Sequence, residues 1–330
     1  MGSIVALLQI VVQRSLANWK LLTTVALGVV VSSALMASVI IYSDAVRDLG
    51  LSYAIRNAGP LDLHVRVVST SQKAQPEIHA HRRATTVGAV QRKTRGFLDE
   101  LVVAGRSATF FLTAPGEPVP DDDLRPRAHF LFSSGIEDHV RLVEGRAPEP
   151  AEPAPPGSAP TLEVSLGREA AEQLGVAVGD TFDLHPFWAL DLEPVHITVV
   201  GIIEPLDPAD PYFFAREGRF VVTTTSWPTY PFWTSERDLI DVVAAYLPAM
   251  DGTFETYAFL DFEKINARNA PQLAADLNAL AFELRRDVQH TAIETKLPTL
   301  ISTYQDKLFF TRLPLFALML LIVGIALYYL

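Results

Sequence analysis

Residues 21–42 read LLTTVALGVVVSSALMASVIIY, a stretch of 22 residues without a charged side chain. As a helix it would be roughly 33 Å long, enough to cross a hydrocarbon core of about 30 Å. The stretch is too long, and begins too far from the N-terminus, for the apolar core of a cleaved signal peptide. It therefore predicts a first transmembrane helix and indicates the fold class of a membrane protein.

A second apolar stretch closes the sequence. Residues 313–330 read LPLFALMLLIVGIALYYL and again carry no charge. Pro314 would lie in the first turn of a helix, where its missing N–H has no partner to lose, so the stretch predicts a second transmembrane helix. Because no basic residue follows to hold a cytoplasmic end, we expect the natural polypeptide to continue beyond Leu330.

The residues before the first span predict the orientation of the chain. Residues 1–20 are mostly apolar, with Arg14 and Lys20 but no acidic side chain, and they predict a helix that lies in the cytoplasmic interface. The positive-inside rule then places residues 43–312 outside the cytoplasm. Lys307 and Arg312 weakly oppose this orientation. We expect a multi-pass protein of the cell membrane, bacterial inner or plasma membrane, with a large extracytoplasmic domain.

The composition excludes several classes of function. The formal net charge is −11, and such an acidic body repels phosphate backbones, so we expect no nucleic-acid partner. Without cysteine, disulfide scaffolds, thiolate metal sites and cysteine nucleophiles are excluded. The sequence has no P-loop, G-x-S-x-G, H-E-x-x-H or EF-hand motif. We therefore expect no enzymatic activity and no cofactor in this chain.

The outer region predicts an α+β domain in two parts. A Pro-rich loop at 147–160 divides it, and a β-rich subdomain at about 161–230 follows. We expect a split βαβ-type unit with this β-rich subdomain inserted, the whole domain being flanked by the two transmembrane helices. The expected strands lie near 61–67, 107–113, 162–165, 181–184, 195–203, 219–225 and 254–262, and the expected helices near 87–104, 168–174 and 264–289.

Two short clusters resemble fragments of metal sites. His79-Ala80-His81 would place two imidazoles on one face of a strand, but no acidic pair nearby completes the ligand set. Asp121-Asp122-Asp123 lacks the glycine and the distal glutamate of an EF-hand loop. In both cases a solvated loop is the better interpretation, and we expect no metal site.

Aromatic side chains gather between Phe187 and Trp233, in a stretch interrupted by many prolines. Exposed on loops, they would offer a surface for a hydrophobic substrate or a protein partner, and packed together they would form a small core that pins those loops. The two interpretations are nearly balanced, with a slight preference for the surface. The candidate surface residues are Trp188, Tyr212, Phe213, Phe214, Trp227, Phe232 and Trp233.

Four segments resemble a known family in their order and spacing. They are Leu142–Pro148 (LVEGRAP), Glu163–Ser165 (EVS), Ala171–Asp180 (AEQLGVAVGD) and His196–Ile202 (HITVVGI). Together, between a first and a second span, they resemble ABC-transporter permeases of the MacB, LolC and FtsX type. Gly175 would cap a helix in the left-handed conformation, and the turn at Gly179 would lead into a strand. The motif residues with an expected structural role are Gly145, Arg146, Pro148, Gly175, Gly179, Asp180 and Gly201.

The resemblance implies a role and partners. Such permeases couple ATP hydrolysis by a separate or fused cytoplasmic ATPase to movement of the outer domain, which acts on a hydrophobic or peptide- or lipoprotein-like substrate or on a partner protein. It implies an ABC-type ATPase subunit as partner, a homodimer or a heterodimer with a second permease, and an extracytoplasmic partner protein. The family's usual four spans and its coupling loop are not within residues 1–330.

A different class remains open on the topology alone. Two spans around an outer domain also form the front half of chemoreceptors and sensor kinases, in which a ligand shifts the second helix. The Gly-Arg-x-Pro and Leu-Gly-x-x-x-Gly-Asp segments favour the permease, because topology does not discriminate between the two.

Overall fold

A computed structural model of the chain describes residues 19–121, 125–152, 155, 157–214, 219–222, 227–307 and 320. Its α-helices are α2 (Trp19–Asn57), α3 (Pro60–Leu63), α4 (Pro76–Thr94), α5 (Arg168–Leu174) and α6 (Ala270–Asp287), and residues 297–307 are also helical. Its strands are β1 (Val65–Lys73), β2 (Leu98–Ser107), β3 (Phe110–Thr113), β4 (Arg127–Ser133), β5 (Val140–Gly145), β6 (Thr161–Gly167), β7 (Thr181–Pro186), β8 (Val195–Pro205), β9 (Thr229–Trp233), β10 (Asp251–Leu260) and β11 (Thr291–Glu294). The predicted α+β class of the domain is confirmed.

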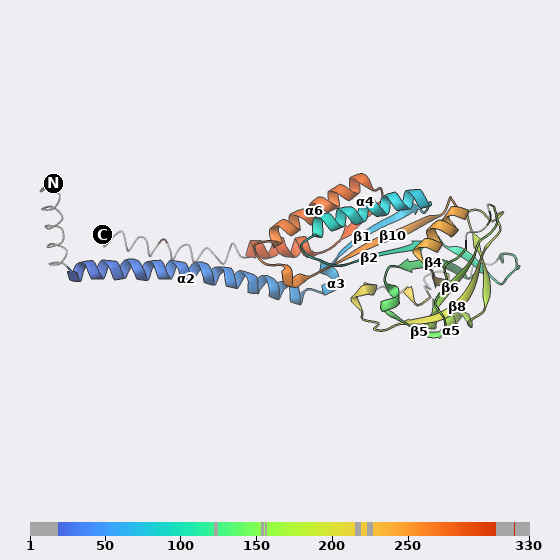
Figure 1. Cartoon of the computed structure of the whole chain (residues 1–330), viewed down its shortest axis with the longest axis horizontal. Coiled ribbons are helices and arrows are strands. Elements are labelled where there is room, and N and C mark those ends of the chain that lie inside the picture. The colour runs from blue at the N-terminus through green and yellow to red at the C-terminus, as the bar shows by residue number, and fades with distance from the viewer. Residues whose placement is uncertain are drawn as a thin grey trace.

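Helix α2 is 39 residues long and extends away from the sheets, as Figure 1 shows. It includes residues 21–42, whose helical conformation agrees with the prediction. A search of the described residues finds no helix with the length and hydropathy that a membrane crossing requires, so neither predicted span is confirmed. The predicted interfacial helix at 1–20, apart from Trp19 and Lys20, and the predicted second span, apart from Leu320, lie outside the described residues.

The part of the domain next to α2 is a four-stranded antiparallel sheet in the order β11-β1-β10-β2, covered on one face by α4 and α6. Helix α6 presents Leu273, Leu277, Leu280 and Leu284 to the sheet at helical spacing, as predicted. It begins at Ala270 rather than near residue 264. This face of the sheet is packed by aliphatic side chains, with Val65, Val67, Ala258 and Leu260 among them.

Two predicted boundaries in this part are wrong. Only the first part of the helix expected at 87–104 belongs to α4, which ends at Thr94. Residues 98–104 belong to strand β2 instead. Pro76 fixes the start of α4, because its ring pre-sets the backbone of a first helical turn. Residues 98–107 become a strand because they pair with β10 on one side and with β4 on the other. The strand expected at 61–67 begins only at Val65, after the short helix α3.

The β-rich part is a closed barrel. Strand β4 pairs with β3, β3 with β7, β7 with β8, β8 with β6, β6 with β9, and β9 returns to β4. Closure leaves these six strands without a free edge, and β5 adds to the outside of β8. The barrel takes β3 and β4 from before the Pro-rich loop, so it extends beyond the expected range of about 161–230. Phe110, Phe130, Leu162, Ile197 and Phe232 fill its interior, each at most 1% exposed.

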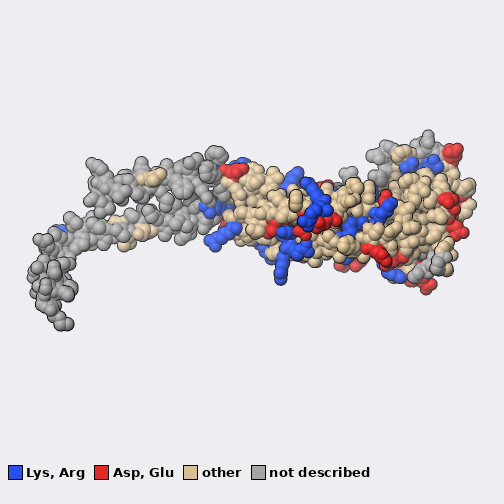
Figure 2. Space-filling view, turned by 90° about the horizontal axis from the view of Figure 1, so that it is seen from above, with Lys and Arg blue, Asp and Glu red and all other residues tan. Residues whose placement is uncertain are grey.

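The sheet and the barrel are joined through the pairing of β2 with β4. Residues 206–222, which we call the cover segment, connect β8 with β9 and return to the sheet face that the helices leave open; its residues 215–218 are not among those described. Residues 219–222 are not a strand, contrary to the strand predicted at 219–225, whose remainder lies outside the described residues. Figure 2 shows acidic and basic side chains interleaved over the face of the domain that it presents.

Candidate functional site

The sheet face under the cover segment carries charged side chains, unlike the aliphatic face under the helices. Because side chains alternate along a strand, Val65 and Val67 point to the helices and Arg66 points to the cover segment. The pairing register places Arg66 opposite Tyr257 on β10, beside Glu255. The strands thus bring opposite charges together beneath a loop.

Glu255 is the centre of a buried ion cluster. It pairs with Arg66 at 2.6 Å and with Arg219 of the cover segment at 3.5 Å. The hydroxyl of Tyr257 donates to Glu255 and accepts from Arg219 at 2.5 Å. Arg66 also pairs with the half-exposed Glu294 of β11. Burial lowers the pKa of Arg219, and the neighbouring Glu255 partly opposes this effect. Arg219 therefore ties the cover segment to the sheet by charge.

Tyr212 anchors the cover segment a second time. Its hydroxyl lies 2.7 Å from the Ser133 hydroxyl and donates to the Ser134 carbonyl oxygen at 2.9 Å. Its ring stacks on His139 with 3.8 Å between centroids. Burial raises the pKa of Tyr212 to about 12. The neutral Tyr212 side chain thus links the cover segment to the end of β4 by hydrogen bonds.

The preference for an exposed aromatic surface is wrong for most of the candidate residues. Tyr212, Phe213, Phe232 and Trp233 are at most 5% exposed, and Trp188 and Phe214 are partly buried. Phe232 fills the barrel, Trp233 donates to the Arg219 carbonyl oxygen at 3.0 Å, and Phe214 packs on Tyr257. Tyr212, Phe213, Phe214 and Trp233 thus help to hold the cover segment in place, whereas Phe232 and Trp188 belong to the barrel core. Trp227 differs, because it is 42% exposed.

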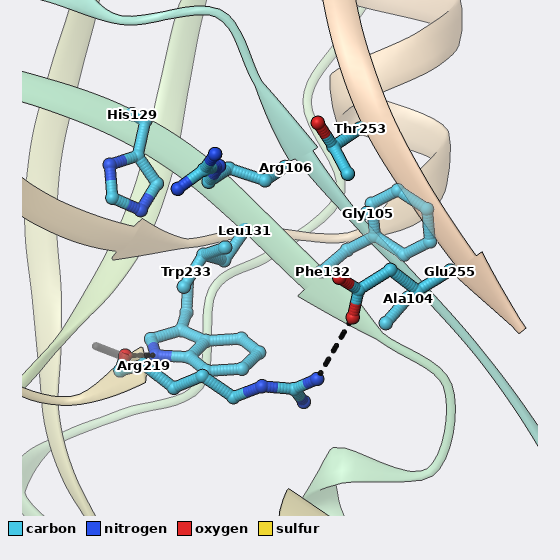
Figure 3. Close-up of a pocket in the computed structure, with 10 residues that line it drawn as sticks. All are labelled: Ala104, Gly105, Arg106, His129, Leu131, Phe132, Arg219, Trp233, Thr253 and Glu255. Carbon is cyan, nitrogen blue, oxygen red and sulfur yellow. Dashed lines mark hydrogen bonds and ion pairs between the residues drawn. The ribbon is translucent and has the colours of Figure 1, made fainter. Parts of the chain in front are cut away.

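A cleft opens beside the ion cluster, at the junction of sheet and barrel. Figure 3 shows its inner part, where Arg106 of β2, His129 of β4, Thr253 of β10 and the ion pair of Arg219 with Glu255 surround a cavity of about 160 Å³. A wider cavity of about 380 Å³ adjoins it and reaches Trp227. Arg106, His129 and Thr253 line both cavities. The cleft is the candidate binding site of the domain.

The family-like segments form the side of the barrel around β5, β6 and β8. Gly145 lies opposite Gly201 in the β5–β8 pair, and a Cβ at either position would come within 2.3 Å of a backbone oxygen of the other strand's segment. Arg146 donates two hydrogen bonds to Glu163 of β6, at 2.6 and 2.5 Å. The Arg146 guanidinium lowers the pKa of Glu163. Pro148 lines a separate groove beside Trp233.

The predicted cap and turn of this region are confirmed. Gly175 ends α5 in the left-handed conformation, and its N–H donates to the carbonyl oxygens of Ala171 and Glu172. At the next turn the Gly179 N–H donates to the Val199 carbonyl oxygen at 2.7 Å, and the Asp180 carboxylate accepts from the Ala177 N–H. These motif residues set the path of the chain into β7.

The two metal-like clusters do not form sites within the part of the chain described. His79 and His81 lie on α4, not on a strand, so they point to different sides: His79 is buried against Glu236 and His81 is exposed. Among the described residues no group of three possible ligands comes together. Asp122 and Asp123 lie outside the described residues.

No sequence motif identifies the charged residues of the cluster and the cleft. Alternation of Arg66 with Val65 and Val67 predicts a half-buried strand with the arginine on its solvent side. The only local sign of a buried ion pair is that Arg66 and Glu255 are charged residues within strand-like stretches. Their pairing depends on the register of β1 against β10, which cannot be read from local sequence.

Comparisons with known proteins give a limited result. No protein-family model matches the sequence, and no curated protein matches it. Among solved structures, the chain is similar to the periplasmic region of MacB from Actinobacillus actinomycetemcomitans, with a TM-score of 0.36 and 10% sequence identity, over 77% of this chain and 98% of that chain. A TM-score of this size carries no conclusion about function.

Proposed function

We propose that this chain is a permease subunit of an ABC-type transporter or mechanotransmission complex, in which an outer domain moves in response to a cytoplasmic ATPase. The observation that carries the proposal is the close contact between α2 and the helix at 297–307, which we call the stalk pair. These are the two segments that lead to the two predicted spans. A movement of either span would therefore reach the domain through one joint.

The stalk pair is tightly packed. Leu51 and Ile55 of α2 and Leu297 and Ile301 of the second helix belong to one buried cluster, all at most 6% exposed. The Tyr304 hydroxyl donates to the Arg47 carbonyl oxygen at 2.5 Å. A Cβ at Gly50 would lie 2.8 Å from that hydroxyl, so glycine permits this approach of the two helices.

The stalk pair is also fixed to the sheet. Lys296 pairs with Asp62 through its ammonium group and through its backbone N–H, both at 2.7 Å. These residues precede the helix at 297–307 and strand β1, respectively, and β1 pairs with β11. Asp48 of α2 accepts from the Ala267 N–H near the start of α6. A shift within the stalk pair would thus act on β1, β11 and α6 together.

Two further observations support the proposal. Residues 1–330 contain no P-loop, which fits an ATP-binding site outside this segment, on a cytoplasmic ABC-type ATPase, with a second permease, identical or different, completing the complex. The charge-free stretches at 21–42 and 313–330 support a membrane location with the domain outside. The cargo would be hydrophobic or peptide- or lipoprotein-like, or the domain would act on a partner protein.

The topology is tested by cysteine labelling, which the absence of native cysteines makes clean. Ser158→Cys lies in an exposed turn of the domain and should react with a membrane-impermeant thiol reagent on intact cells. Ser3→Cys should react only after the cells are opened. Labelling of Ser3→Cys alone on intact cells would invert the topology and remove the proposal.

The transmission role is tested at Gly50. A complex reconstituted with its ATPase should change the fluorescence of a dye on Ser158→Cys when a non-hydrolysable ATP analogue binds. Gly50→Leu should abolish most of this response, because the larger side chain separates the stalk pair. Gly96→Leu, at a position with no atom within 4 Å of an added Cβ, is the matched control. An equal response in both variants would contradict the permease role. So would a cross-linking experiment that captures a histidine kinase instead of an ATPase as the partner.

A further inference from the structure

The cleft at the junction of sheet and barrel has a charge that its own residues do not balance. Arg66 and Arg219 share the carboxylate of Glu255, and Glu294 adds to the balance of Arg66. Arg106, which lines both cavities of the cleft, is exposed and has no ion pair or hydrogen bond with another described residue. Its guanidinium is therefore a free cation facing the cleft.

The acidic residues of the cleft do not neutralise Arg106. Asp251 lines the wider cavity but pairs with Lys73 at 2.8 Å. Glu255 lies on the inner wall and is committed to Arg66, Arg219 and Tyr257. The chain as a whole carries a net charge of −11, so an uncompensated arginine in a cavity is unusual for its surroundings.

His129 adds a buried polar group without a partner. Its side chain is only 3% exposed, and its ring lies next to Arg106 in Figure 3. The ring makes no hydrogen bond with any other residue that the structure describes. Burial, together with the charge of Arg106, lowers the pKa of His129 to about 3, so the imidazole is neutral near neutral pH. It then offers one N–H donor and one acceptor to whatever occupies the cleft.

The remaining walls suit a small polar ligand. Thr109, Thr229 and Thr253 line the wider cavity, and Trp227 forms one side of it. The Thr229 hydroxyl donates to the Trp227 carbonyl oxygen at 3.2 Å. The outer face of Trp227 is held by Arg127, whose guanidinium lies 3.8 Å from the ring centroid. The wider cavity, of about 380 Å³, falls in the usual range of small-molecule sites.

We propose that this cleft binds the oxyanion of a small ligand, a carboxylate or a phosphate group, with Arg106 as the cation and His129, Thr109 and Thr253 as hydrogen-bond partners. The planar guanidinium matches two oxygens of either group. The proposal concerns the domain by itself and does not depend on the transmission role. Failure of the Gly50 experiment would leave it untouched, and its failure would leave the permease proposal standing.

Binding is measured on the full purified chain. Inorganic phosphate and succinate are titrated separately at constant ionic strength, with sodium chloride as the reference, while tryptophan fluorescence reports on Trp227 and calorimetry gives the affinity. At least one of the two anions should bind saturably to a single site with a Kd of about 1 mM or tighter. Phosphate alone would identify a phosphorylated ligand, and succinate alone a carboxylate. Saturation by neither would overturn the proposal.

Variants assign the binding to the cleft. Arg106→Gln should weaken binding at least about tenfold without lowering the melting temperature, because its side chain is exposed. Arg106→Lys keeps the charge but loses the bidentate donor, so its affinity should lie between that of Arg106→Gln and that of the unchanged chain. Arg285→Gln, an exposed arginine of α6 on the helix layer, is the matched control and should bind as the unchanged chain does. Equal binding by Arg106→Gln and Arg285→Gln would overturn the proposal.

Discussion

The two faces of the β11-β1-β10-β2 sheet are covered in opposite ways. Helices α4 and α6 cover one face mainly with leucine, valine and alanine side chains, and the buried Arg82 of α4 lies over the Phe254 ring of β10. The cover segment lies on the other, where Arg66, Glu255 and Arg219 are buried together and tyrosine hydroxyls make hydrogen bonds.

The difference follows from what each cover does with its backbone. A helix satisfies its own N–H and C=O groups, so apolar packing is enough to hold it on a sheet. An irregular segment cannot, and its polar groups need partners on the surface it covers. Arg219 and Tyr212 supply such anchors here. On this sheet, the charged side chains that the strands themselves bury, Arg66 and Glu255, lie on the face covered by a loop rather than by helices.

The largest effect is expected at the centre of the loop-covered face. Glu255→Ala would leave Arg66 and Arg219 buried without their carboxylate, and such a loss costs about 3–5 kcal/mol. Thermal unfolding of the full chain should show it as a large drop in melting temperature. Glu294→Ala removes a pairing carboxylate that is 57% exposed, and it should cost less than about 1 kcal/mol. Equal costs would contradict the assignment of Glu255 as the anchor.

On the helix-covered face, the expected cost comes from lost packing alone. Leu277→Ala on α6 should destabilise by about 2–5 kcal/mol, because the side chain is only 1% exposed and leaves a cavity. Phe282→Ala on the same helix, at a side chain that is 74% exposed, should be nearly neutral. A loss at Phe282 as large as that at Leu277 would contradict the assignment of Leu277 to the core.

Acid should destabilise the domain through two buried histidines, His64 and His129. Burial lowers the pKa of His64 to about 4 and, with the help of Arg106, that of His129 to about 3, against 6.5 for an exposed histidine. Between these values only the unfolded chain takes up the proton, so the stability present above pH 6.5 is lost as the pH falls toward 4. From pH 6.5 to 5 the loss is about 2 kcal/mol for each histidine.

Substitution separates the histidine contributions. In melting curves between pH 7 and pH 4.5, the stability of His129→Phe should fall less steeply than that of the unchanged chain, because the variant lacks an imidazole that only the unfolded chain protonates. His81→Phe, at an exposed position on α4, serves as control and should keep the full slope. A parallel slope for His129→Phe would show that its imidazole takes up protons in the folded state.

The smallest effect concerns a single hydroxyl. Tyr212→Phe removes the bonds to Ser133 and Ser134 while it keeps the aromatic packing, and it should cost about 1 to 2 kcal/mol. Trp227→Phe, at a ring that is 42% exposed, should cost less than about 0.5 kcal/mol. If Trp227→Phe were the more harmful of the two, the assignment of Tyr212 to the core and Trp227 to the surface would be reversed.

Several elements could be predicted because their signals are local. Helix α6 has its leucines at helical spacing, and α5 with its Gly175 cap was placed at its observed residues. The helix predicted at 87–104 is wrong in its second part, because the apolar residues there fit a helix and a strand equally. Only the pairing with β10 and β4 makes this part a strand. The predicted exposure of the aromatic stretch is wrong for a related reason. Local sequence does not show which surface a loop packs against.

The sequence by itself determined the α+β class, the charge-free stretches at 21–42 and 313–330, the turns at Gly175 and Gly179 and the lack of enzyme motifs. Each depends on residues within a few positions of one another. Only the tertiary structure decided that six strands close into a barrel, that the cover segment buries the aromatic rings, and that Arg106 meets His129. The physical reason is strand register, since a shift of one residue would exchange the two faces of the sheet.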